Sequence, residues 1–374
     1  MEYRTFPTLN DRISLLGFGL MRLPKLPGSQ KVDYATATQM IELAMQAGVN
    51  YYDTAYVYHA GDSELFVGEV LSKYPRESYF LADKLPTWML KSEEDVHRYF
   101  DEQLKKCSTD YFDYYLVHSL SRMTIDKKML AHNVIPILKQ KQKEGKIRHL
   151  GFSFHDDYDT LAYLLSLNDW DFGQLQINYL DWEMQNAEKL YQLMEQKGVP
   201  TIVMEPVRGG VLANLGSEAA AHLHAVNPAA SQASWALRFV AALPNVCCTL
   251  SGMSNMEQVI DNLATFADFQ PLSEQETKAL WEARDIYRAQ GAVPCTACQY
   301  CMPCPAKVNI PNNFFAYNHY CASKDKAQYT GRFIEPGSKA ENCTSCGACV
   351  EVCPQHIDIP AELAKIAEFD VSLV

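Results

Sequence analysis

The stretch V-N-Y-Y-D-T-A-Y-V-Y, residues 49–58, is followed at residues 63–72 by S-E-L-F-V-G-E-V-L-S, and this unit decides the fold. Val49–Asp53 is rich in β-branched and aromatic side chains, a composition that favours a buried strand. Residues 63–72 carry apolar side chains at helical spacing, which predicts an amphipathic helix. Gly48 comes directly before this strand, at a position that suits the left-handed cap of a preceding helix.

The same pairing of a short strand with a helix recurs along the first 270 residues or so. The candidate strands are Ile13–Phe18, Val49–Asp53, Tyr79–Lys84, Tyr114–His118, His149–Phe154, Gln174–Asn178, Thr201–Met204 and Cys247–Leu250. The candidate helices are Tyr34–Ala47, Ser63–Ser72, Ser92–Cys107, Val134–Glu144, Asp157–Leu167, Ala187–Lys197, Ala230–Ala242 and Asn255–Thr265. Eight such units in series predict an α/β fold, a (β/α)8 TIM barrel. A doubly wound open sheet is the alternative, but no G-x-G-x-x-G follows the first strand.

The last eighty residues hold nine of the twelve cysteines. Eight of them form two runs: Cys295, Cys298, Cys301 and Cys304, then Cys343, Cys346, Cys349 and Cys353. The second run reads C-x2-C-x2-C-x3-C-P, the spacing of a bacterial two-cluster ferredoxin. This spacing predicts two [4Fe–4S] clusters and electron transfer.

In the cross-over arrangement of such ferredoxins, the fourth cysteine of each run binds the other cluster. Cys353 then completes the cluster of the first run, and Cys304 completes that of the second. Only two residues separate Cys301 from Cys304, where the usual run has three, so the ligand role of Cys304 stays open. Cys321 is left over and is expected to be a packed thiol.

The other interpretations of these cysteines are structural zinc, a disulfide framework and structural thiols. Structural zinc uses paired C-x2-C knuckles, for which a third cysteine at the same step is superfluous. The chain starts M-E-Y-R-T-F-P-T-L-N, without the pattern of a secretion signal. Thiols of a protein that is not exported stay reduced, which disfavours a disulfide framework and purely structural thiols.

The predicted domain boundary lies at about residue 290. A helical segment from Ser273 to about Arg288 ends near Gly291, and Pro294 introduces the first cysteine run. We therefore expect a barrel domain over residues 1–290 and an iron–sulfur domain over residues 291–374. Residues 312–320 and Ile359–Phe369 read as helices, so the second domain is expected to be mainly helical and ferredoxin-like.

Bulk composition excludes some classes of function. The formal net charge of −12 disfavours nucleic acid as a partner, because that binding depends on Lys and Arg meeting phosphates. No apolar run reaches the length of about 20 residues that spans a bilayer, so no membrane partner is expected. Hydrophobic residues make up 48% and charged residues 21%, as in ordinary globular proteins, and we expect a cytoplasmic location.

Several motifs then point to one family. Y-Y-D-T-A-Y-V-Y (51–58), Lys84, L-V-H (116–118) and G-K-I-R-H-L-G-F-S (145–153) resemble those of the aldo-keto reductases, over roughly residues 1–270. The cysteine-rich tail resembles the subgroup that carries a two-cluster iron–sulfur domain. The resemblance implies a catalytic tetrad of Asp53, Tyr58, Lys84 and His118.

The resemblance also implies the role of each member of the tetrad. Tyr58 is the general acid, Lys84 lowers the pKa of its phenol, Asp53 holds Lys84 charged, and His118 orients the substrate carbonyl. Tyr56 is the rival for the acid role.

The resemblance further implies an NADP or NAD cofactor extended across the barrel mouth. The implied contacts are Gly19, Met21, Asp53, Ser153, Gln176, Met204, Pro206, Val207, Gly209, Gly252, Ser254, Gln258 and Asn262. Ser153 and Gln176 match the residues that hold the carboxamide, His155 substitutes for the usual Asn, and Met204 stands where the stacking Tyr is usual. The stretch 251–262 lacks the Lys and Arg that many members set against a 2′-phosphate, so NADH is an alternative to NADPH.

Two functions follow as hypotheses. The first is an oxidoreductase that exchanges hydride with a small carbonyl or alcohol substrate, with two clusters for electron transfer or docking to an electron-carrier protein. The second is a redox-sensing or electron-transfer adaptor whose barrel binds nucleotide with little turnover. The substrate is not given by the sequence.

Overall fold

The computed structural model describes residues 1–326, 329 and 334–372. Contacts divide the chain into two compact units. The first unit comprises Met1–Pro206 and Ala236–Pro271, and the second comprises Val207–Trp235 and Leu272–Val374. The domain boundary expected at about residue 290 stays a prediction.

Eight parallel strands close into a barrel in the first unit, in the order β10-β3-β4-β5-β6-β7-β8-β9. They are β3 (Leu16–Gly19), β4 (Tyr51–Asp53), β5 (Phe80–Leu85), β6 (Phe112–Leu120), β7 (Ile147–Phe154), β8 (Phe172–Gln176), β9 (Thr201–Met204) and β10 (Val246–Ser251). Each strand overlaps one of the eight predicted strands. The (β/α)8 prediction is thus confirmed, and the open-sheet alternative is wrong because β10 pairs with β3.

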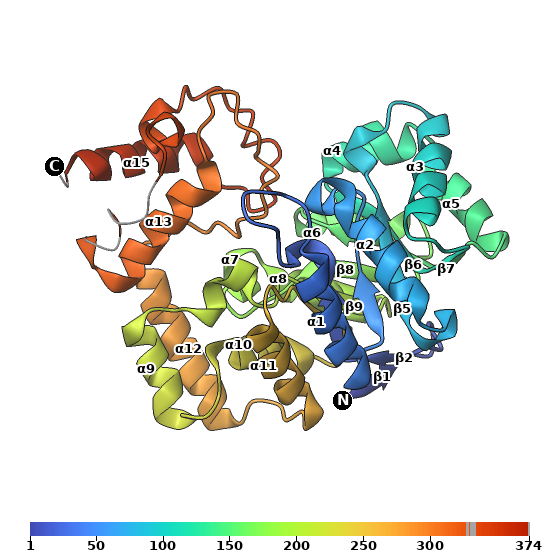
Figure 1. Cartoon of the computed structure of the whole chain (residues 1–374), viewed down its shortest axis with the longest axis horizontal. Coiled ribbons are helices and arrows are strands. Elements are labelled where there is room, and N and C mark those ends of the chain that lie inside the picture. The colour runs from blue at the N-terminus through green and yellow to red at the C-terminus, as the bar shows by residue number, and fades with distance from the viewer. Residues whose placement is uncertain (327–328, 330–333, 373–374) are drawn as a thin grey trace. The chain divides into compact units, whose positions relative to one another are not determined.

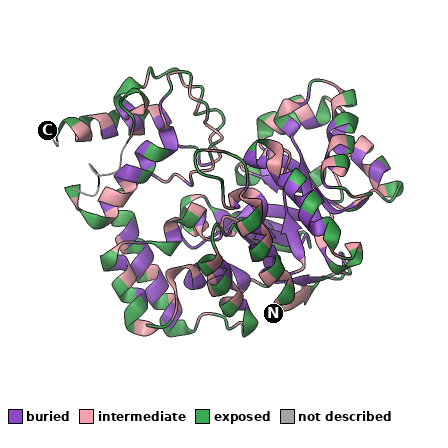
Figure 2. Ribbon diagram, in the orientation of Figure 1, coloured by how far each residue is buried: buried purple, intermediate pink, exposed green. Residues whose placement is uncertain are grey.

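Helices surround these strands in Figure 1. In the first unit they are α1 (Tyr34–Gln46), α2 (Asp62–Val70), α3 (Glu93–Lys106), α4 (Arg122–Thr124), α5 (Val134–Lys143), α6 (Tyr158–Ser166), α7 (Asp181–Met184), α8 (Ala187–Gln196) and α11 (Met256–Ala267). Helix α10 (Gln232–Ala241) runs across the border of the two units. Figure 2 shows the strands almost wholly buried and the outer helix faces exposed. Tyr51, Tyr52, Tyr114 and Tyr115 are 0% exposed, so their rings belong to the buried core.

A hairpin that the sequence did not predict precedes the barrel. It pairs β1 (Tyr3–Thr5) with β2 (Arg12–Ser14) in antiparallel register. The predicted strand Ile13–Phe18 is therefore two strands, because the chain leaves the hairpin and enters the barrel at Leu15. The Ser14 hydroxyl donates to the Leu16 carbonyl at 2.7 Å, a local bond that competes with a continuous ladder.

The second unit is built from helices and loops. Helices α9 (Ser217–Val226) and α12 (Glu274–Ala289) lie side by side, and α13 (Ile310–Ser323) packs against α15 (Ile359–Val371) (Figure 1). Its core includes Val308, Phe314, Leu363 and Ile366, all at most 1% exposed. The predicted helices near residues 312–320 and at Ile359–Phe369 are confirmed.

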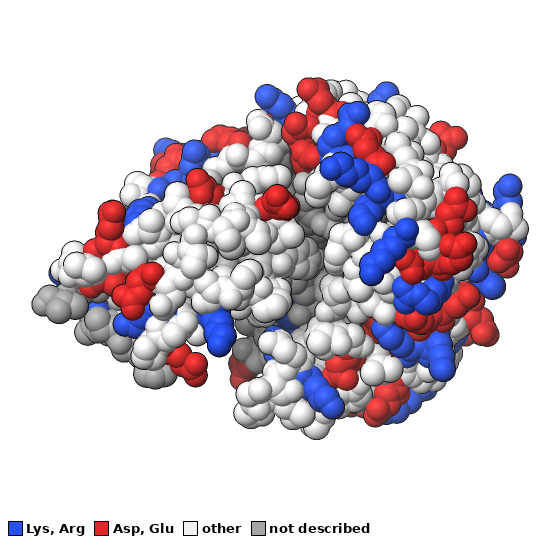
Figure 3. Space-filling model, turned by 90° about the horizontal axis from the view of Figure 1, so that it is seen from above, with Lys and Arg blue, Asp and Glu red and all other residues white. Residues whose placement is uncertain are grey.

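Side chains of both charges lie at the surface of the molecule (Figure 3). On the face drawn in Figure 3, Lys and Arg side chains lie interspersed with Asp and Glu side chains. Among the residues that the structure describes, no helix combines the length and apolar character that crossing a membrane requires.

Candidate active site and cysteine centre

The four tetrad residues come from neighbouring parallel strands of the barrel. Asp53 ends β4, Lys84 lies near the end of β5, and His118 lies near the end of β6. Tyr58 begins a short helical turn, Tyr58–Gly61, in the loop after β4. Because parallel strands end at the same rim of a barrel, residues far apart in sequence meet there.

Lys84 is the centre of this group. Its Nζ lies 2.5 Å from Asp53 Oδ1, 2.8 Å from the Thr54 carbonyl oxygen and 3.4 Å from the Tyr58 hydroxyl. The ammonium also lies over the Tyr58 ring, 4.9 Å from its centroid. Lys84 is 0% and Asp53 3% exposed, so their ion pair is screened very little by water.

His118 completes the group and lies beside the phenol. Its ring centroid lies 6.2 Å from that of Tyr58 and 5.1 Å from that of Trp88. Burial, then the charges of Lys84 and His155, hold the pKa of His118 well below its ordinary value. The imidazole is therefore neutral at pH 7 and can donate one N–H bond.

Burial outweighs the lowering of the Tyr58 pKa that was predicted from Lys84. Burial, then the negative charges of Asp53 and Glu205, raise the pKa of Tyr58 well above its ordinary value, while Arg22 lowers it. The Lys84 ammonium is matched by the Asp53 carboxylate, so the pair presents little net positive charge to the phenol. Burial then dominates, because it penalises the phenolate.

Asp53 is held by two partners. Gln174 Nε2 donates to its second oxygen, Oδ2, at 3.1 Å. Burial raises the pKa of Asp53, and the charge of Lys84 and these hydrogen bonds oppose that rise. The carboxylate therefore depends on Lys84 to remain ionised in this buried site.

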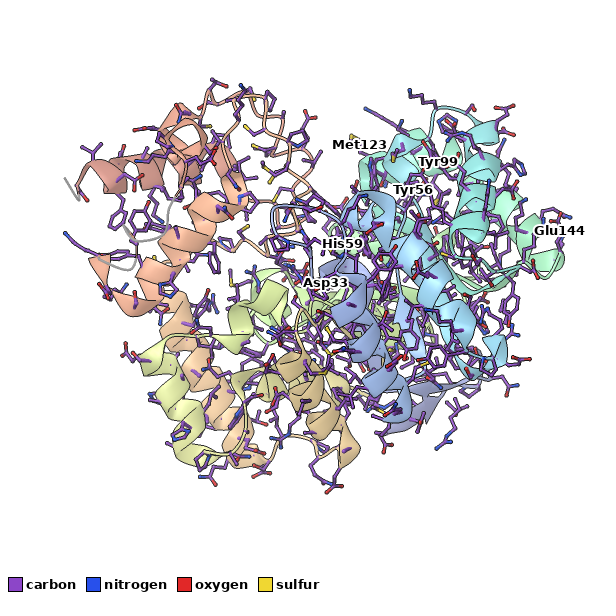
Figure 4. The ribbon with its side chains drawn as sticks, in the orientation of Figure 1. Asp33, Tyr56, His59, Tyr99, Met123 and Glu144 are labelled. Atoms are coloured by element: carbon purple, nitrogen blue, oxygen red, sulfur yellow. The ribbon has the colours of Figure 1, made fainter. Side chains whose placement is uncertain are left out.

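Tyr56 does not compete for the acid role. Its hydroxyl donates to Glu102 Oε2 at 2.8 Å, and its ring meets Tyr99 at a centroid distance of 4.9 Å (Figure 4). Both partners belong to helix α3, outside the barrel strands. Tyr56 thus anchors a helix, while Tyr58 contacts Lys84.

The residues expected to hold the carboxamide lie beside the tetrad. The Ser153 hydroxyl accepts a 2.7 Å bond from the backbone N–H of Ser119, the residue after His118. Gln176 ends β8, and its Nε2 donates to Asp181 Oδ2 at 2.7 Å. Both side chains are buried and polar, as carboxamide recognition requires, so the donor set fits a nicotinamide.

The residues expected along the rest of the cofactor meet at the ends of β10 and β3. Ser254 Oγ donates to the Arg22 carbonyl at 2.8 Å, and Ser254 N–H donates to Gln258 Oε1 at 2.7 Å. Asn262 Nδ2 donates to Ser251 Oγ at 2.7 Å. A side chain at Gly252 would press on Arg22 at 3.2 Å, and one at Gly19 would lie 3.4 Å from the Ser251 carbonyl.

Met204 ends β9 and is half-buried, and Pro206, two residues on, ends the first of the two segments that form the first unit. Val207 and Gly209 belong to the second unit, and the cofactor contacts predicted for them stay predictions. Gly209 has φ 65°, and a Cβ there would lie 2.2 Å from the Thr296 carbonyl oxygen. The close packing against Thr296 therefore requires glycine at this position independently of a cofactor.

Two residues at the rim were missed by the sequence analysis. Asn178 Nδ2 donates to Asp181 Oδ2 at 2.7 Å and to the Glu205 carbonyl at 3.1 Å. Glu205 also pairs with Arg22 at 3.3 Å. Only their positions in the sequence could have indicated that they lie at the rim, because Asn178 ends a predicted strand and Glu205 directly follows another.

None of the eight run cysteines, all of which the structure describes, forms a disulfide. The charges that raise the pKa of Cys301, after burial, are those of Cys298, Cys295 and Cys353. Burial also raises the pKa of Cys349, and the cysteine charges that add to this rise are those of Cys343, Cys346 and Cys304. Among the described residues, no three His, Cys, Asp or Glu side chains converge closely enough for one metal ion.

A pocket in the second unit carries the first of these groups. Its lining includes Cys295, Cys298, Cys301 and Cys353, with Phe314 and other apolar side chains. Thiolates in an apolar pocket are the donors that an iron–sulfur cluster takes. Cys321 is buried beside the Gly291 carbonyl, in agreement with a packed thiol.

Comparison with known proteins identifies the family. The aldo/keto reductase family profile matches residues 15–285, and a 4Fe-4S dicluster domain profile matches residues 294–357. The chain belongs to the aldo/keto reductase family. This aldo/keto reductase is an NAD(P)-dependent oxidoreductase, and its C-terminal region carries a 4Fe-4S dicluster domain.

Two curated relatives are similar to this aldo/keto reductase. L-galactose dehydrogenase of Arabidopsis thaliana is 26% identical, covering 76% of this chain and 94% of the relative. The NADH-specific methylglyoxal reductase of Escherichia coli is 26% identical, covering 55% of this chain and 67% of the relative.

A solved structure supports the fold. The holo form of an aldo-keto reductase from Bacillus halodurans matches with a TM-score of 0.62 at 24% identity, covering 76% of this chain and 96% of that chain.

Proposed function

We propose that this aldo/keto reductase reduces a small carbonyl compound, or oxidises the corresponding alcohol, at Tyr58. The observation that carries the proposal is the position of Lys84 Nζ, which contacts both Asp53 and the Tyr58 hydroxyl inside the barrel rim. A bound reduced nicotinamide supplies the hydride.

Tyr58 is proposed to donate its proton to the carbonyl oxygen. Its raised pKa keeps the phenol protonated at neutral pH, which is the state that reduction needs. Lys84 then stabilises the phenolate that forms, because its ammonium lies 3.4 Å from that oxygen. Neutral His118 donates its N–H to the same carbonyl oxygen and orients it.

We propose NADH rather than NADPH as the preferred cofactor. The stretch S-G-M-S-N-M-E-Q-V-I-D-N, residues 251–262, carries the acids Glu257 and Asp261 and no Lys or Arg. Arg22, the cation beside Ser254, is paired with Glu205. A dianionic 2′-phosphate without a cationic partner binds poorly.

The NADH proposal predicts that NADPH binds at least about tenfold more weakly than NADH, a difference of about 1.4 kcal/mol. Glu257→Arg should tighten NADPH binding and leave NADH nearly unchanged, because it adds a cation only against the extra phosphate. Titration of each nucleotide by fluorescence measures both constants. Equal affinities in the wild-type protein would reject the preference.

For the clusters, we propose the cross-over ligand sets. Cys295, Cys298, Cys301 and Cys353 hold one [4Fe–4S] cluster, and Cys343, Cys346, Cys349 and Cys304 hold the other. The charge neighbours of Cys301 and Cys349 support this assignment. Cys346 is exposed, so we further propose that the second cluster exchanges single electrons with a carrier protein.

Anaerobically purified protein should contain about eight irons and eight sulfides, as two cubes require. Cys304→Ser should lower the content to about four irons, because the second cluster loses a thiolate. Cys321→Ser is the matched control and should keep all eight. A Cys304→Ser protein with full iron content would remove Cys304 from the ligand set.

The direct test of the proposed reaction is steady-state consumption of NADH with a panel of small aldehydes, ketones and sugars under anaerobic conditions. Turnover with at least one carbonyl compound is expected. Binding of the nucleotide without turnover across the panel would favour the redox-sensing adaptor instead.

A further inference from the structure

A second cluster of titratable side chains lies behind the tetrad, on the outer side of strand β5. Side chains alternate along a strand, so Asp83 points away from the side that Lys84 occupies. Asp83 and Glu64 are both 0% exposed and their carboxyl groups lie close enough to act on each other, and Glu64 Oε1 is buried without a hydrogen-bond donor among the described residues. Glu64 belongs to α2, which follows the turn that begins at Tyr58. The contact therefore joins the two elements that carry Lys84 and Tyr58.

Only one positive charge, the Lys106 ammonium, is available to balance the two carboxyl groups of this pair. Lys106 Nζ of α3 lies 2.8 Å from Glu64 Oε2. The Lys84 ammonium is engaged with Asp53 on the inner side of the strand. The remaining titratable neighbours are neutral: the Cys107 thiol, 3.7 Å from Asp83 Oδ2, and the Tyr115 phenol. Two ionised carboxylates with one ammonium would leave an uncompensated buried charge, which costs several kcal/mol.

One proton is therefore retained, and the contacts assign it to Asp83. Glu64 has the ion pair with Lys106, whereas Asp83 has only neutral donors, including the Lys84 backbone N–H at 2.8 Å. In agreement, burial and then the charge of Glu64 raise the pKa of Asp83 well above its ordinary value. Burial also raises the pKa of Glu64, but Lys106 opposes that rise.

We propose that Asp83 is a positioning residue of the active site, a neutral carboxylic acid whose O–H bond to Glu64 ties the Lys84 strand to the Tyr58 segment. Its Oδ1 fixes the backbone at Lys84, and its proton holds α2 against β5. The inference rests on the proposed function for the roles of Lys84 and Tyr58. Loss of the proton would place two carboxylates in contact and separate the two elements.

The proposal gives a definite pH dependence. A carboxyl group whose folded-state pKa is raised stabilises the fold below its unfolded pKa of about 3.9, and this stability is lost as the pH rises through the folded pKa. Tm and kcat should therefore fall together on the alkaline side. Asp83→Asn keeps a neutral donor and the acceptor for Lys84 N–H, so it should remove that alkaline decline.

The experiment compares Asp83→Asn with Asp83→Ala in the full cluster-loaded chain. At pH 7, Asp83→Ala should lose about tenfold in kcat, while Asp83→Asn should retain most of it; tenfold corresponds to about 1.4 kcal/mol. Infrared spectra at pH 7 should show a protonated-carboxyl C=O band that Asp83→Asn removes. Tyr58→Phe should keep this band, which separates the inference from the proposed reaction.

Two results would overturn the inference. One is a wild-type infrared spectrum that Asp83→Asn leaves unchanged in the protonated-carboxyl region. The other is an alkaline decline of Tm that is the same in Asp83→Asn and in the wild-type protein.

Discussion

Replacing Tyr58 with Phe is expected to lower kcat/KM for carbonyl reduction by about 10²–10⁴-fold, the usual contribution of a positioned general acid. The substitution removes one oxygen from a side chain that is only 9% exposed, and it leaves the ring beside His118 in place. NADH affinity and iron content should therefore stay at wild-type values. Steady-state rates with the best carbonyl substrate measure the effect.

Tyr56→Phe is the matched control for this prediction. Tyr56 lies two residues away in the same loop, but its hydroxyl bonds Glu102 of α3. Loss of that part-buried bond should cost about 1 kcal/mol of stability and change kcat/KM little. If the two variants lose activity equally, the loop rather than the Tyr58 hydroxyl limits the reaction.

Replacing Lys84 with Met is expected to damage both activity and stability. The phenolate of Tyr58 would lose its ammonium neighbour, and kcat should fall at least about 10²-fold. Asp53 would remain buried without its cation, which costs about 3–5 kcal/mol when one partner of a buried pair is removed. Chemical denaturation with the clusters in place measures the second effect.

The double variant Lys84→Met with Asp53→Asn separates the two effects. Removing the orphaned carboxylate should recover most of the lost stability, while kcat should stay low because the ammonium is still absent. The stability loss of Lys84→Met alone should grow with pH as Asp53 ionises. A double variant as unstable as Lys84→Met would mean that Asp53 is not the buried charge that matters.

The sequence predicted the barrel well because each strand is short, apolar and followed by an amphipathic helix. The ends of helices were also predicted correctly where a positive φ angle favours glycine. Gly48 and Gly145, which follow helices α1 and α5, adopt φ values of 92° and 76°. The β1–β2 hairpin was missed because its strands have three residues each, too few for an alternating pattern.

The tetrad could be predicted because its members stand at strand ends in a recognisable order. The electrostatics of the site could not. The raised pKa of Tyr58 depends on burial and on Asp53 and Glu205, two acids that are distant in sequence from each other. The Asp83–Glu64 contact was equally invisible, since neither residue belongs to a motif. The charge balance of a buried site depends on which ionisable side chains are in contact. The spacing of residues along the sequence does not show these contacts.

The most direct test of the central claim follows the hydride. The wild-type protein is incubated anaerobically with an accepted carbonyl compound and NADH that carries deuterium at both hydrogens of the nicotinamide C4 atom. The account predicts that each turnover places one deuterium on the carbinol carbon of the product alcohol. A product alcohol without deuterium at that carbon would contradict hydride transfer at the Tyr58 site.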